Sequence, residues 1–226
     1  MKARNVQSSK GVTLVGGGSV LPENLRIATA FAPTLIAADG GAHHCVSEGL
    51  TPTAVIGDLD SVNDTMRNTF PDTDFIHVSE QDSTDFEKSL TRINAPFVLA
   101  TGFTAPRLDH TLAVFATMAR RIGPPTLVLG EGDVIFAAPK NLTLNLPIGT
   151  RLSLFPLEPM KGQSTGLKWP INDLTLGPGN TIGTSNETTG PVSLSFDKPG
   201  CLILLPPQTF EAALHALVGP ASVPGQ

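Results

Sequence analysis

The sequence is poor in charge, and the charge that it has does not form a basic surface. Only 15% of the 226 residues are Asp, Glu, Lys or Arg, against about 25% in an average globular domain. The fifteen Lys and Arg are scattered, their only doublet is Arg120-Arg121, and the formal net charge is −5. This composition argues against long solvated helices and coiled coils. It also argues against nucleic-acid or membrane-surface partners, which select for a basic stripe.

Cysteine and long apolar runs are also scarce. The two cysteines, Cys45 and Cys201, belong to no CxxC motif and are too few for a disulfide framework. We interpret them as ordinary thiols in a reducing compartment. The polar N-terminus is followed by the short apolar segment Val12–Val15, whereas a secretory signal needs about 7–15 apolar residues and a membrane span about 20. The sequence therefore predicts a cytoplasmic protein.

Glycine and proline are abundant, with 22 and 20 copies spread along the chain without a period. They predict many turns between short elements. In the first half, short apolar runs end at or near a glycine and alternate with helix-period segments. Such runs are typical of strands that are buried on both faces. They are Val12–Val15, Leu35–Ala38, Ala54–Ile56, Phe97–Ala100 and Leu127–Leu129.

Two helices are predicted between these runs. Thr84 and Glu87 fit a capping box at a helix start, and an apolar stripe follows over Phe86–Ile93. A second apolar stripe predicts a helix that Gly123 and two prolines end, with members at Leu108, Leu112, Phe115, Ala119 and Ile122. Strands that alternate with helices indicate an α/β domain over residues 1–138, with a mostly parallel, doubly wound, Rossmann-like sheet. Ligands bind such sheets at the carboxyl ends of the strands.

The second half changes its hydrophobic period. Leu142–Leu146 and Val192–Phe196 alternate strictly, as half-buried antiparallel strands do. The pattern predicts an all-β sandwich or partial barrel in a domain over residues 141–226. This domain is expected to end with a short helix at Phe210–Val218 and a frayed tail at 219–226. Further short strands are predicted at Arg151–Phe155, Gly166–Trp169, Leu174–Leu176 and Cys201–Leu205.

Acidic side chains gather where the predicted strands of the first half end. Asp39 follows one strand and Asp58 and Asp60 follow the next, while Asp85 and Asp109 begin the two predicted helices. In a parallel sheet these positions share one edge. Two carboxylates two residues apart in an extended segment share a face and repel each other unless a cation compensates. Mg²⁺ is the usual ion, because one or two carboxylates are enough to hold it and its other coordination positions stay open for phosphates.

Each of these carboxylates also has a purely structural interpretation. An Asp after Gly at a strand end is ordinary turn chemistry, and a carboxylate at the first position of a helix, such as Asp85, gains from the helix dipole. Lys88, one turn later, is either a solvated charge or a phosphate ligand. The gathering of several carboxylates at one edge favours the metal. His43-His44 does not predict a metal site, since adjacent helical side chains point about 100° apart.

The only tryptophan, Trp169, lies in the β half, and the chain has no tyrosine. A tryptophan in a small sandwich belongs either to the core or to a platform on which an aromatic or cationic ligand stacks. The sequence leaves both alternatives open.

Six segments, taken together and in order, resemble the thiamine pyrophosphokinase family. They are Ala38–Ala42, Gly57–Ser61, Gln81–Lys88, Arg107–His110, Gly166–Trp169 and Thr184–Glu187. The resemblance spans most of the chain, from Val12 to Pro206. It implies an enzyme that transfers a pyrophosphoryl group from ATP to the hydroxyl of thiamine and releases AMP. It also implies Mg²⁺ and a homodimer, each chain having a nucleotide- and metal-binding α/β domain and a thiamine-binding β-sandwich.

The same resemblance implies the site residues. The metal ligands are expected to be Asp58, Asp60 and Asp85, which count as catalytic residues together with Asp109. The nucleotide-binding residues are expected to be Asp39, Gly40, Gly41, Lys88, Arg107 and His110. The substrate-binding residues are expected to be Gln81, Trp169, Ser185 and Asn186, in a thiamine pocket that the family completes across the dimer interface.

Two positions depart from the family pattern. The loop before Arg107 is usually glycine-rich, but here Ala105 and Pro106 stand in it, and a proline has no N–H to offer a phosphate. Val114 stands where an Asn is common. Two other functions therefore stay open beside the kinase. One is another Mg-dependent, nucleotide-using transferase, and the other is a catalytically silent nucleotide or thiamine binder.

Overall fold

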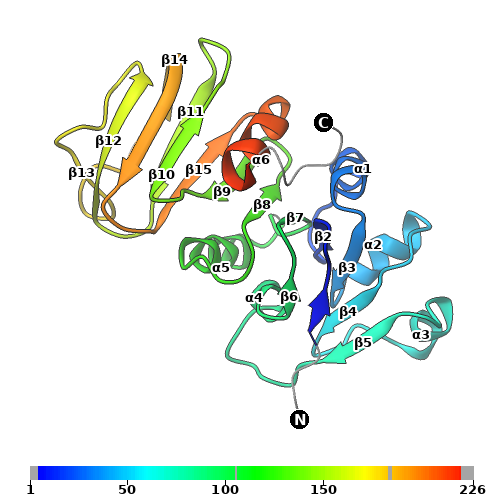
Figure 1. Ribbon diagram of the computed structural model, residues 1–226. Helices are drawn as coiled ribbons and strands as arrows, with labels where there is room; N and C mark the ends of the chain where they lie inside the picture. The colour runs from blue at the N-terminus through cyan, green and yellow to red at the C-terminus, as the bar shows by residue number, and fades with distance from the viewer. Residues whose placement is uncertain (1–4, 105, 183–184, 220–226) are drawn as a thin grey trace. The chain divides into compact units, whose positions relative to one another are not determined.

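The structure is a computed structural model that describes residues 5–104, 106–182 and 185–219 (Figure 1). The chain forms two compact units. Unit 1 comprises Met1–Thr117 and Ile122–Gly130, and unit 2 comprises Met118–Arg121 and Glu131–Gln226. Three features predicted from the sequence fall outside the described residues: Ala105 in the altered loop, Thr184 in the last family segment, and the tail after Gly219.

Unit 1 is built on short strands that pair in parallel. β2 (Val12–Val15) pairs with β7 (Val98–Thr101), which pairs with β8 (Thr126–Leu129). β3 (Thr34–Ala38), β4 (Ala54–Gly57) and β5 (Asp74–His77) form a second parallel set (Figure 1). β1 (Val6–Gln7) pairs in parallel with β6 (Ile93–Asn94). The five strands predicted in this half are confirmed, with ends that differ by a residue.

The sequence pattern missed β5 for a physical reason. Asp74 and His77 at its two ends are exposed, Phe75 is half-buried, and only Ile76 is buried. An apolar run therefore does not mark it, whereas all four residues of β2, β4, β7 and β8 are buried.

The helices of unit 1 are short, and α4 begins as predicted. Thr84 is its N-cap, and the Thr84 hydroxyl accepts a hydrogen bond of 3.3 Å from the backbone N–H of Glu87. The apolar stripe predicted to continue along this helix is wrong at its end, because α4 stops at Leu90 and Ile93 lies in β6. The helices are α1 (Pro22–Phe31), α2 (Gly41–Ser47), α3 (Asp64–Thr69), α4 (Asp85–Leu90) and α5 (Leu108–Ala119).

α5 confirms the second predicted helix only as far as Ala119, before the predicted stop at Gly123, so Ile122 lies outside it. The role of its stripe is not confirmed. Leu108 is 71% exposed and Leu112 is 51% exposed, while Val114 and Met118 are buried. A period of 3.6 residues shows which side chains share a face. It does not show whether anything within the same chain covers that face.

The core of unit 1 includes a continuous layer between helices and strands. Leu25 from α1, Cys45 from α2 and Met66 from α3 pack with Ala37 of β3 and Val55 of β4. These residues are at most 4% exposed. The layer fixes the strands, and so it fixes the loops that leave their carboxyl ends.

Unit 2 is an antiparallel β unit. Its longest strand, β14, pairs with β11 through its first residues and with β10 and β12 through later ones. β15 pairs with both β9 and β11, and β13 pairs with β12. The strands are β9 (Val134–Ala137), β10 (Asn141–Leu144), β11 (Arg151–Pro156), β12 (Met160–Leu167), β13 (Thr175–Leu176), β14 (Ser185–Phe196) and β15 (Cys201–Leu205).

Two predictions for this half have different outcomes. The C-terminal helix is confirmed as α6 (Phe210–Val218), after a short 3₁₀ turn at Pro207–Thr209, and it packs against β10. The strand predicted over Gly166–Trp169 is confirmed only for its first two residues, which end β12, and is wrong for Lys168 and Trp169. Gly166 has φ +73° and a Cβ there would lie 2.2 Å from the carbonyl oxygen of Pro191, so the chain bulges at this glycine. Among the described helices, none is long and apolar enough to cross a membrane.

Candidate active site

A cavity of about 570 Å³ lies in unit 1, where the loops after β2, β3, β4 and β7 meet the first turns of α4 and α5. The sheet thus presents its carboxyl strand ends to one space, as parallel sheets do at their ligand sites. Of the residues predicted from the sequence, Asp39, Gly40, Asp58, Gln81, Asp85, Lys88, Arg107 and His110 line it.

Three carboxylates converge at this edge. Ligand oxygens of Asp39, Asp58 and Asp60 all lie within 4.8 Å of one another. The sequence predicted Asp85 as the third partner of Asp58 and Asp60, whereas the structure groups Asp39 with them and leaves Asp85 outside this group. The segment from Asp58 to Asp60 is not extended as assumed, because Leu59 has φ +60°. A turn rather than a strand therefore directs the two side chains.

Asp39 is the most enclosed member of this carboxylate cluster, with 7% exposure. Its Oδ2 accepts a 2.8 Å hydrogen bond from the Ser61 hydroxyl. Its Oδ1 is buried and has no hydrogen-bond partner among the described residues. Burial raises the pKa of Asp39, and the nearby charges of Asp85, Asp60 and Asp58 raise it further against the lowering effect of the Ser61 hydrogen bond.

The backbone around Asp39 is as constrained as its side chain. Asp39 has φ +39°, a left-handed conformation that non-glycine residues rarely adopt outside special sites. The neighbouring strand end carries Gly57, where a Cβ would lie only 2.7 Å from the Cβ of Asp39. The local fold therefore places a strained, poorly solvated carboxylate beside two others. Hard oxygen ligands and an unsatisfied buried acceptor fit a magnesium ion.

Lys88 provides the positive charge nearest to these carboxylates in the described part of the cavity wall. Its Nζ lies 3.2 Å from Oδ1 of Asp85 and 3.4 Å from Oδ2 of Asp58. The Lys88 side chain is 3% exposed, so the alternative of a solvated charge is wrong. Burial raises the pKa of Asp58 but the charge and hydrogen bond of Lys88 more than offset it, so this pKa is lowered. Burial lowers the pKa of Lys88, and its two carboxylate partners more than compensate, so this pKa is raised.

Arg107 and Asp109 form a bidentate pair at the start of α5. Nη2 of Arg107 lies 2.6 Å from Oδ2 of Asp109, and Nε lies 3.2 Å from Oδ1. Both side chains are 65% exposed. The hydrogen bonds from Arg107 hold the pKa of Asp109 below its usual range. Arg107 and His110 line the cavity, and Asp109 is not among its lining residues.

The predicted substrate residues of unit 2 gather around one bend. Trp169 is 56% exposed, so the core alternative for this tryptophan is wrong. Asn186, which is buried, clamps the bend: its Oδ1 accepts from the Trp169 N–H at 3.1 Å and its Nδ2 donates to the Trp169 carbonyl at 2.6 Å. Nζ of Lys168 lies 4.9 Å from the indole centroid. Ser185 opens β14, and its backbone pairs with Ser153.

Sequence reasoning missed the apolar wall of the cavity. The rings of Phe86 and Phe103 lie with centroids 4.7 Å apart at an angle of 58°, and both residues line the cavity. Phe86 had a helix-core interpretation, and nothing in the local pattern around Phe103 marks it as a wall residue. Pro106 and Val114, where the chain departs from the family pattern, line the cavity too.

Two glycines in the loop after β2, Gly17 and Gly18, also line the cavity. His44, which the sequence did not favour as a metal ligand, hydrogen-bonds through Nε2 to the Gly18 carbonyl at 2.8 Å. Its contact in the structure is thus to the backbone of the loop after β2.

A cavity that carries carboxylates, a buried lysine and an arginine at the strand ends of an α/β unit defines a class of protein, the enzymes that handle phosphorylated substrates. The particular family follows from two matches. Residues 27–126 match the model "Thiamin pyrophosphokinase, catalytic domain", and residues 140–201 match "Thiamin pyrophosphokinase, vitamin B1 binding domain". Together these segments cover more than two thirds of the chain. The chain belongs to the thiamin pyrophosphokinase family, and the resemblance found in the sequence is confirmed.

Individual relatives agree with this assignment. Thiamin pyrophosphokinase 1 of Caenorhabditis elegans is 29% identical over 155 residues, which are 61% of this chain and 63% of the relative. The match thus spans less than two thirds of that relative. Thiamine pyrophosphokinase 1 of Oryza sativa subsp. japonica is 25% identical over 198 residues, covering 69% of this chain and 75% of the relative.

Solved structures agree on the fold. Thiamin pyrophosphokinase from Geobacillus thermodenitrificans superposes with a TM-score of 0.71 at 24% identity, covering 87% of this chain and 96% of that one. The Candida albicans enzyme gives 0.72 at 14% identity, covering 91% and 93%. At these identities the likeness shows the fold alone, an N-terminal catalytic unit followed by a C-terminal β unit.

Proposed function

We propose that this chain transfers a pyrophosphoryl group from ATP to the hydroxyl of thiamine, giving thiamine diphosphate and AMP. Family membership supports this activity, and one observation carries it. The carboxylates of Asp39 and Asp58, with Lys88 and Arg107, line a single cavity of about 570 Å³, and Asp60 has an oxygen within 4.8 Å of oxygens of both carboxylates. That volume lies in the range of pockets that hold drug-sized ligands.

The two units divide the work in this proposal. The predicted domain over residues 1–138 would be the nucleotide- and metal-binding catalytic domain, with a doubly wound, Rossmann-like sheet; most of it is unit 1, and its last strand, β9, belongs to unit 2. The parallel strand pairings support that arrangement. Ala37 of β3 and Val55 of β4 pack in one core layer with α1, α2 and α3, whereas α4 packs against the same two strands outside that layer. Residues 141–226 form the thiamine-binding domain, a β-sandwich in which β14 is shared between partner strands.

Asp39, Asp58 and Asp60 are the residues that would hold Mg²⁺. Asp85, the other predicted ligand, is linked to Asp58 by the ammonium group of Lys88, which contacts both carboxylates. When bound, the ion supplies positive charge that neutralises phosphate oxygens during transfer. The fit rests on three hard oxygen donors and on the buried, unpartnered Oδ1 of Asp39. The protein's own part is to hold these oxygens together before the ligand arrives, so that little reorganisation is needed.

Arg107, which lines the same cavity, neutralises phosphate charge. Asp109 holds one edge of its guanidinium through Nε and Nη2, which fixes the plane of the group and leaves other N–H donors free for phosphate oxygens. Both carboxylate oxygens of Asp109 accept hydrogen bonds from Arg107, and Asp109 is not among the residues that line the cavity, so we assign it to orienting Arg107 rather than to accepting the hydroxyl proton. Catalysis then rests on positioning and electrostatics, as is general in phosphoryl transfer.

Thiamine carries a permanently charged thiazolium ring, which suits the face of Trp169. The indole is exposed and already has the ammonium group of Lys168 near its face. We further propose that the enzyme is a homodimer in the cytoplasm. Leu108 and Leu112, one turn apart on α5 and mostly exposed, support a second copy as the cover for this face.

One assay tests the activity. ATP, Mg²⁺ and thiamine are mixed with the purified protein, and AMP and thiamine diphosphate are quantified together. Formation of both in equal amounts is expected. AMP or ADP release that needs an acceptor other than thiamine would identify another Mg-dependent transferase. Tight binding of ATP or thiamine by calorimetry, without turnover over hours, would identify the silent binder that Pro106 in the cavity wall supports.

A further inference from the structure

Lys88 is a full positive charge with almost no access to water. Its side chain is 3% exposed, and it belongs to the last turn of α4 and lines the cavity. A buried ammonium group costs free energy unless it is paired and hydrogen-bonded. The fold must therefore have partners for it in fixed positions, and those partners show what the lysine does.

The two partners come from different elements. Asp85 begins α4, three residues before Lys88, and Asp58 follows β4. The Lys88 Nζ hydrogen-bonds to Oδ1 of Asp85 at 3.2 Å and to Oδ2 of Asp58 at 3.4 Å. The ammonium thus bridges the helix and the loop after the strand, and it ties together two carboxylates that would otherwise repel each other.

One of these partners also belongs to the carboxylate cluster. Asp58 contributes an oxygen within 4.8 Å of oxygens of Asp39 and Asp60. A single carboxylate therefore lies between a fixed internal cation on one side and the proposed metal position on the other. Any divalent ion that binds there is close to the ammonium, and like charges weaken each other's binding at such range.

We propose that Lys88 is an internal counter-ion: it positions Asp58 and Asp85 in the absence of metal and lowers the affinity of the carboxylate cluster for a free divalent cation. This inference rests on the proposed metal role of Asp58 and Asp60. It follows that metal binds well only with the nucleotide, whose negative phosphates offset the lysine. By linkage, metal and nucleotide strengthen each other's binding by the same factor.

This role differs from that of a lysine that only contacts phosphate. A phosphate ligand has no effect on metal binding while no nucleotide is present. A counter-ion has its largest effect under that condition. The two are therefore separated by measuring metal binding to the nucleotide-free protein.

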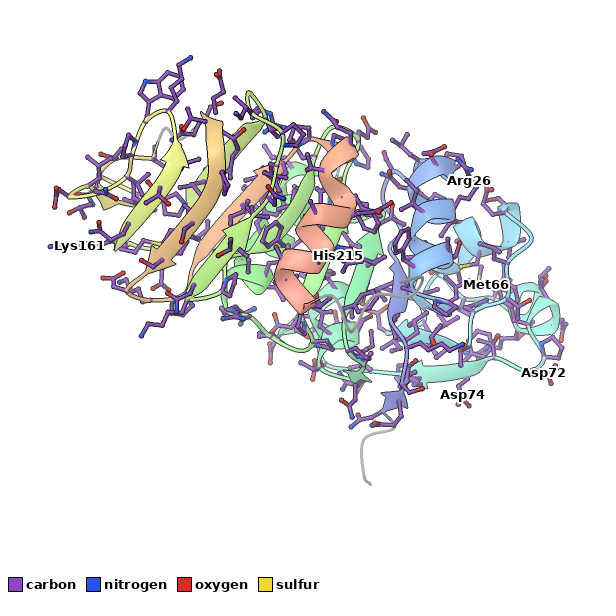
Figure 2. The ribbon with its side chains drawn as sticks, turned by 45° about the horizontal axis from the view of Figure 1, so that its top comes forward. Arg26, Met66, Asp72, Asp74, Lys161 and His215 are labelled. Atoms are coloured by element: carbon purple, nitrogen blue, oxygen red, sulfur yellow. The ribbon has the colours of Figure 1, made fainter. Side chains whose placement is uncertain are left out.

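The test is the Lys88→Met variant, which keeps an unbranched buried side chain and removes the charge. Mn²⁺ binding without nucleotide is measured by electron paramagnetic resonance and Mg²⁺ binding by calorimetry. We expect both ions to bind at least about tenfold more tightly than to the wild type, with a lower metal-free melting temperature that Mn²⁺ restores. The control is Lys161→Met, because Lys161 is exposed on β12 and points away from unit 2 (Figure 2). A smaller gain in Lys88→Met, or an equal gain in Lys161→Met, overturns the inference.

A second variant covers the case in which Lys88→Met does not fold. In the wild type, Asp85→Asn is expected to lower stability, because it removes a partner of the buried ammonium group. In the Lys88→Met background it is expected to raise stability, because it removes a carboxylate that has lost its ammonium partner. Recovery of folded protein, or a rise in melting temperature, in the Asp85→Asn/Lys88→Met double variant supports the counter-ion. A double variant that is less stable than Lys88→Met, or that also fails to fold, overturns it.

The proposed metal role is tested separately in the same series. Wild-type protein with a non-hydrolysable ATP analogue is expected to bind Mn²⁺. If it does and Lys88→Met shows no gain without nucleotide, only the counter-ion inference fails. If neither protein binds Mn²⁺ under any condition, the metal proposal itself fails.

Discussion

Asp39 and Gly57 lie so close that a methyl group on residue 57 would come within 2.7 Å of the Asp39 Cβ and 3.4 Å of its Cα. Asp39 directly follows β3, and Gly57 ends the neighbouring strand β4. The absence of a side chain at 57 is therefore what allows the buried carboxylate of Asp39 to stand beside Asp58 in the carboxylate cluster.

Gly57→Ala tests this contact. The added methyl group has to displace Asp39 or separate the two strand ends, and overpacking of this kind costs about 1–3 kcal/mol. We expect turnover and Mn²⁺ affinity in the presence of an ATP analogue to fall at least about tenfold. The matched control is Gly132→Ala, since nothing lies within 4 Å of a Cβ there. Equal behaviour of the two variants would show that Asp39 does not need its present position.

Removal of the charge on Asp58 tests the centre of the site. Asp58→Asn keeps the shape of the side chain but removes a proposed metal ligand and one partner of Lys88. Turnover is expected to fall at least about 100-fold while circular dichroism still shows a folded protein. Asp72→Asn is the control, because Asp72 is exposed in the turn after α3 (Figure 2) and is not among the residues that line the cavity. Near-normal turnover of purified Asp58→Asn would remove the assignment.

Trp169→Ala tests the proposed thiamine contact in unit 2. Loss of the indole face should raise the KM for thiamine about tenfold, with a smaller change in the KM for ATP. The melting temperature should change little, because the ring is 56% exposed and Asn186 holds the bend through backbone atoms. Ile148→Ala, at a residue that is 76% exposed in the same unit, is the control. A KM for thiamine that stays at the wild-type value would contradict the contact.

The apolar face of α5 predicts the oligomeric state. Leu108→Glu/Leu112→Glu places two charges where the proposed second copy packs, so a dimeric wild type should become monomeric in analytical ultracentrifugation. Val46→Glu on α2, at a residue that is 43% exposed, should leave the dimer intact. A wild type that sediments as a monomer at all concentrations would refute the dimer proposal.

The two cysteines predict how stability depends on alkaline pH. Burial raises the pKa of Cys45 and of Cys201 to about 12, against backbone hydrogen bonds that lower both values. In the unfolded chain both thiols ionise near their ordinary value of about 8.5. Between these values the unfolded state releases protons that the folded state retains, so the free energy of unfolding falls as pH rises. Each thiol contributes a slope of up to about 1.4 kcal/mol per pH unit.

Urea titrations at about pH 8 and about pH 10 measure this slope, since the midpoint reports stability. The Cys45→Ala/Cys201→Ala variant should lose less stability between these two pH values than the wild type does. The same burial predicts that neither thiol reacts with an aromatic disulfide reagent near neutral pH until the protein is unfolded. An identical slope in the variant would mean that other groups govern the alkaline limit.

Features that depend on a few neighbouring residues could be predicted from the sequence. The strand ends at Asp39 and Asp58 and the cap at Thr84 belong to this kind, because apolar runs and capping hydrogen bonds are local. They were enough to place the carboxylates at one edge of unit 1.

Features that depend on packing could not be predicted in this way. The proximity of Asp39 to Asp58 and Asp60 requires the close approach of two strand ends, and in the sequence only Gly57 indicates that approach. The burial of Lys88 depends on what covers α4, and a lysine on a helix is solvated in most settings. The exposure of Trp169 follows from a bulge at Gly166 that ends β12 early.

The single indole has a practical consequence. Since the chain contains one Trp and no Tyr, its near-ultraviolet emission comes from Trp169 alone, on the clamped bend of unit 2. Intrinsic tryptophan fluorescence therefore reports on the surroundings of this one side chain. A cation that displaces the ammonium group of Lys168 from the ring should change that signal directly, whereas melting of unit 1 by itself should leave the tryptophan emission unchanged.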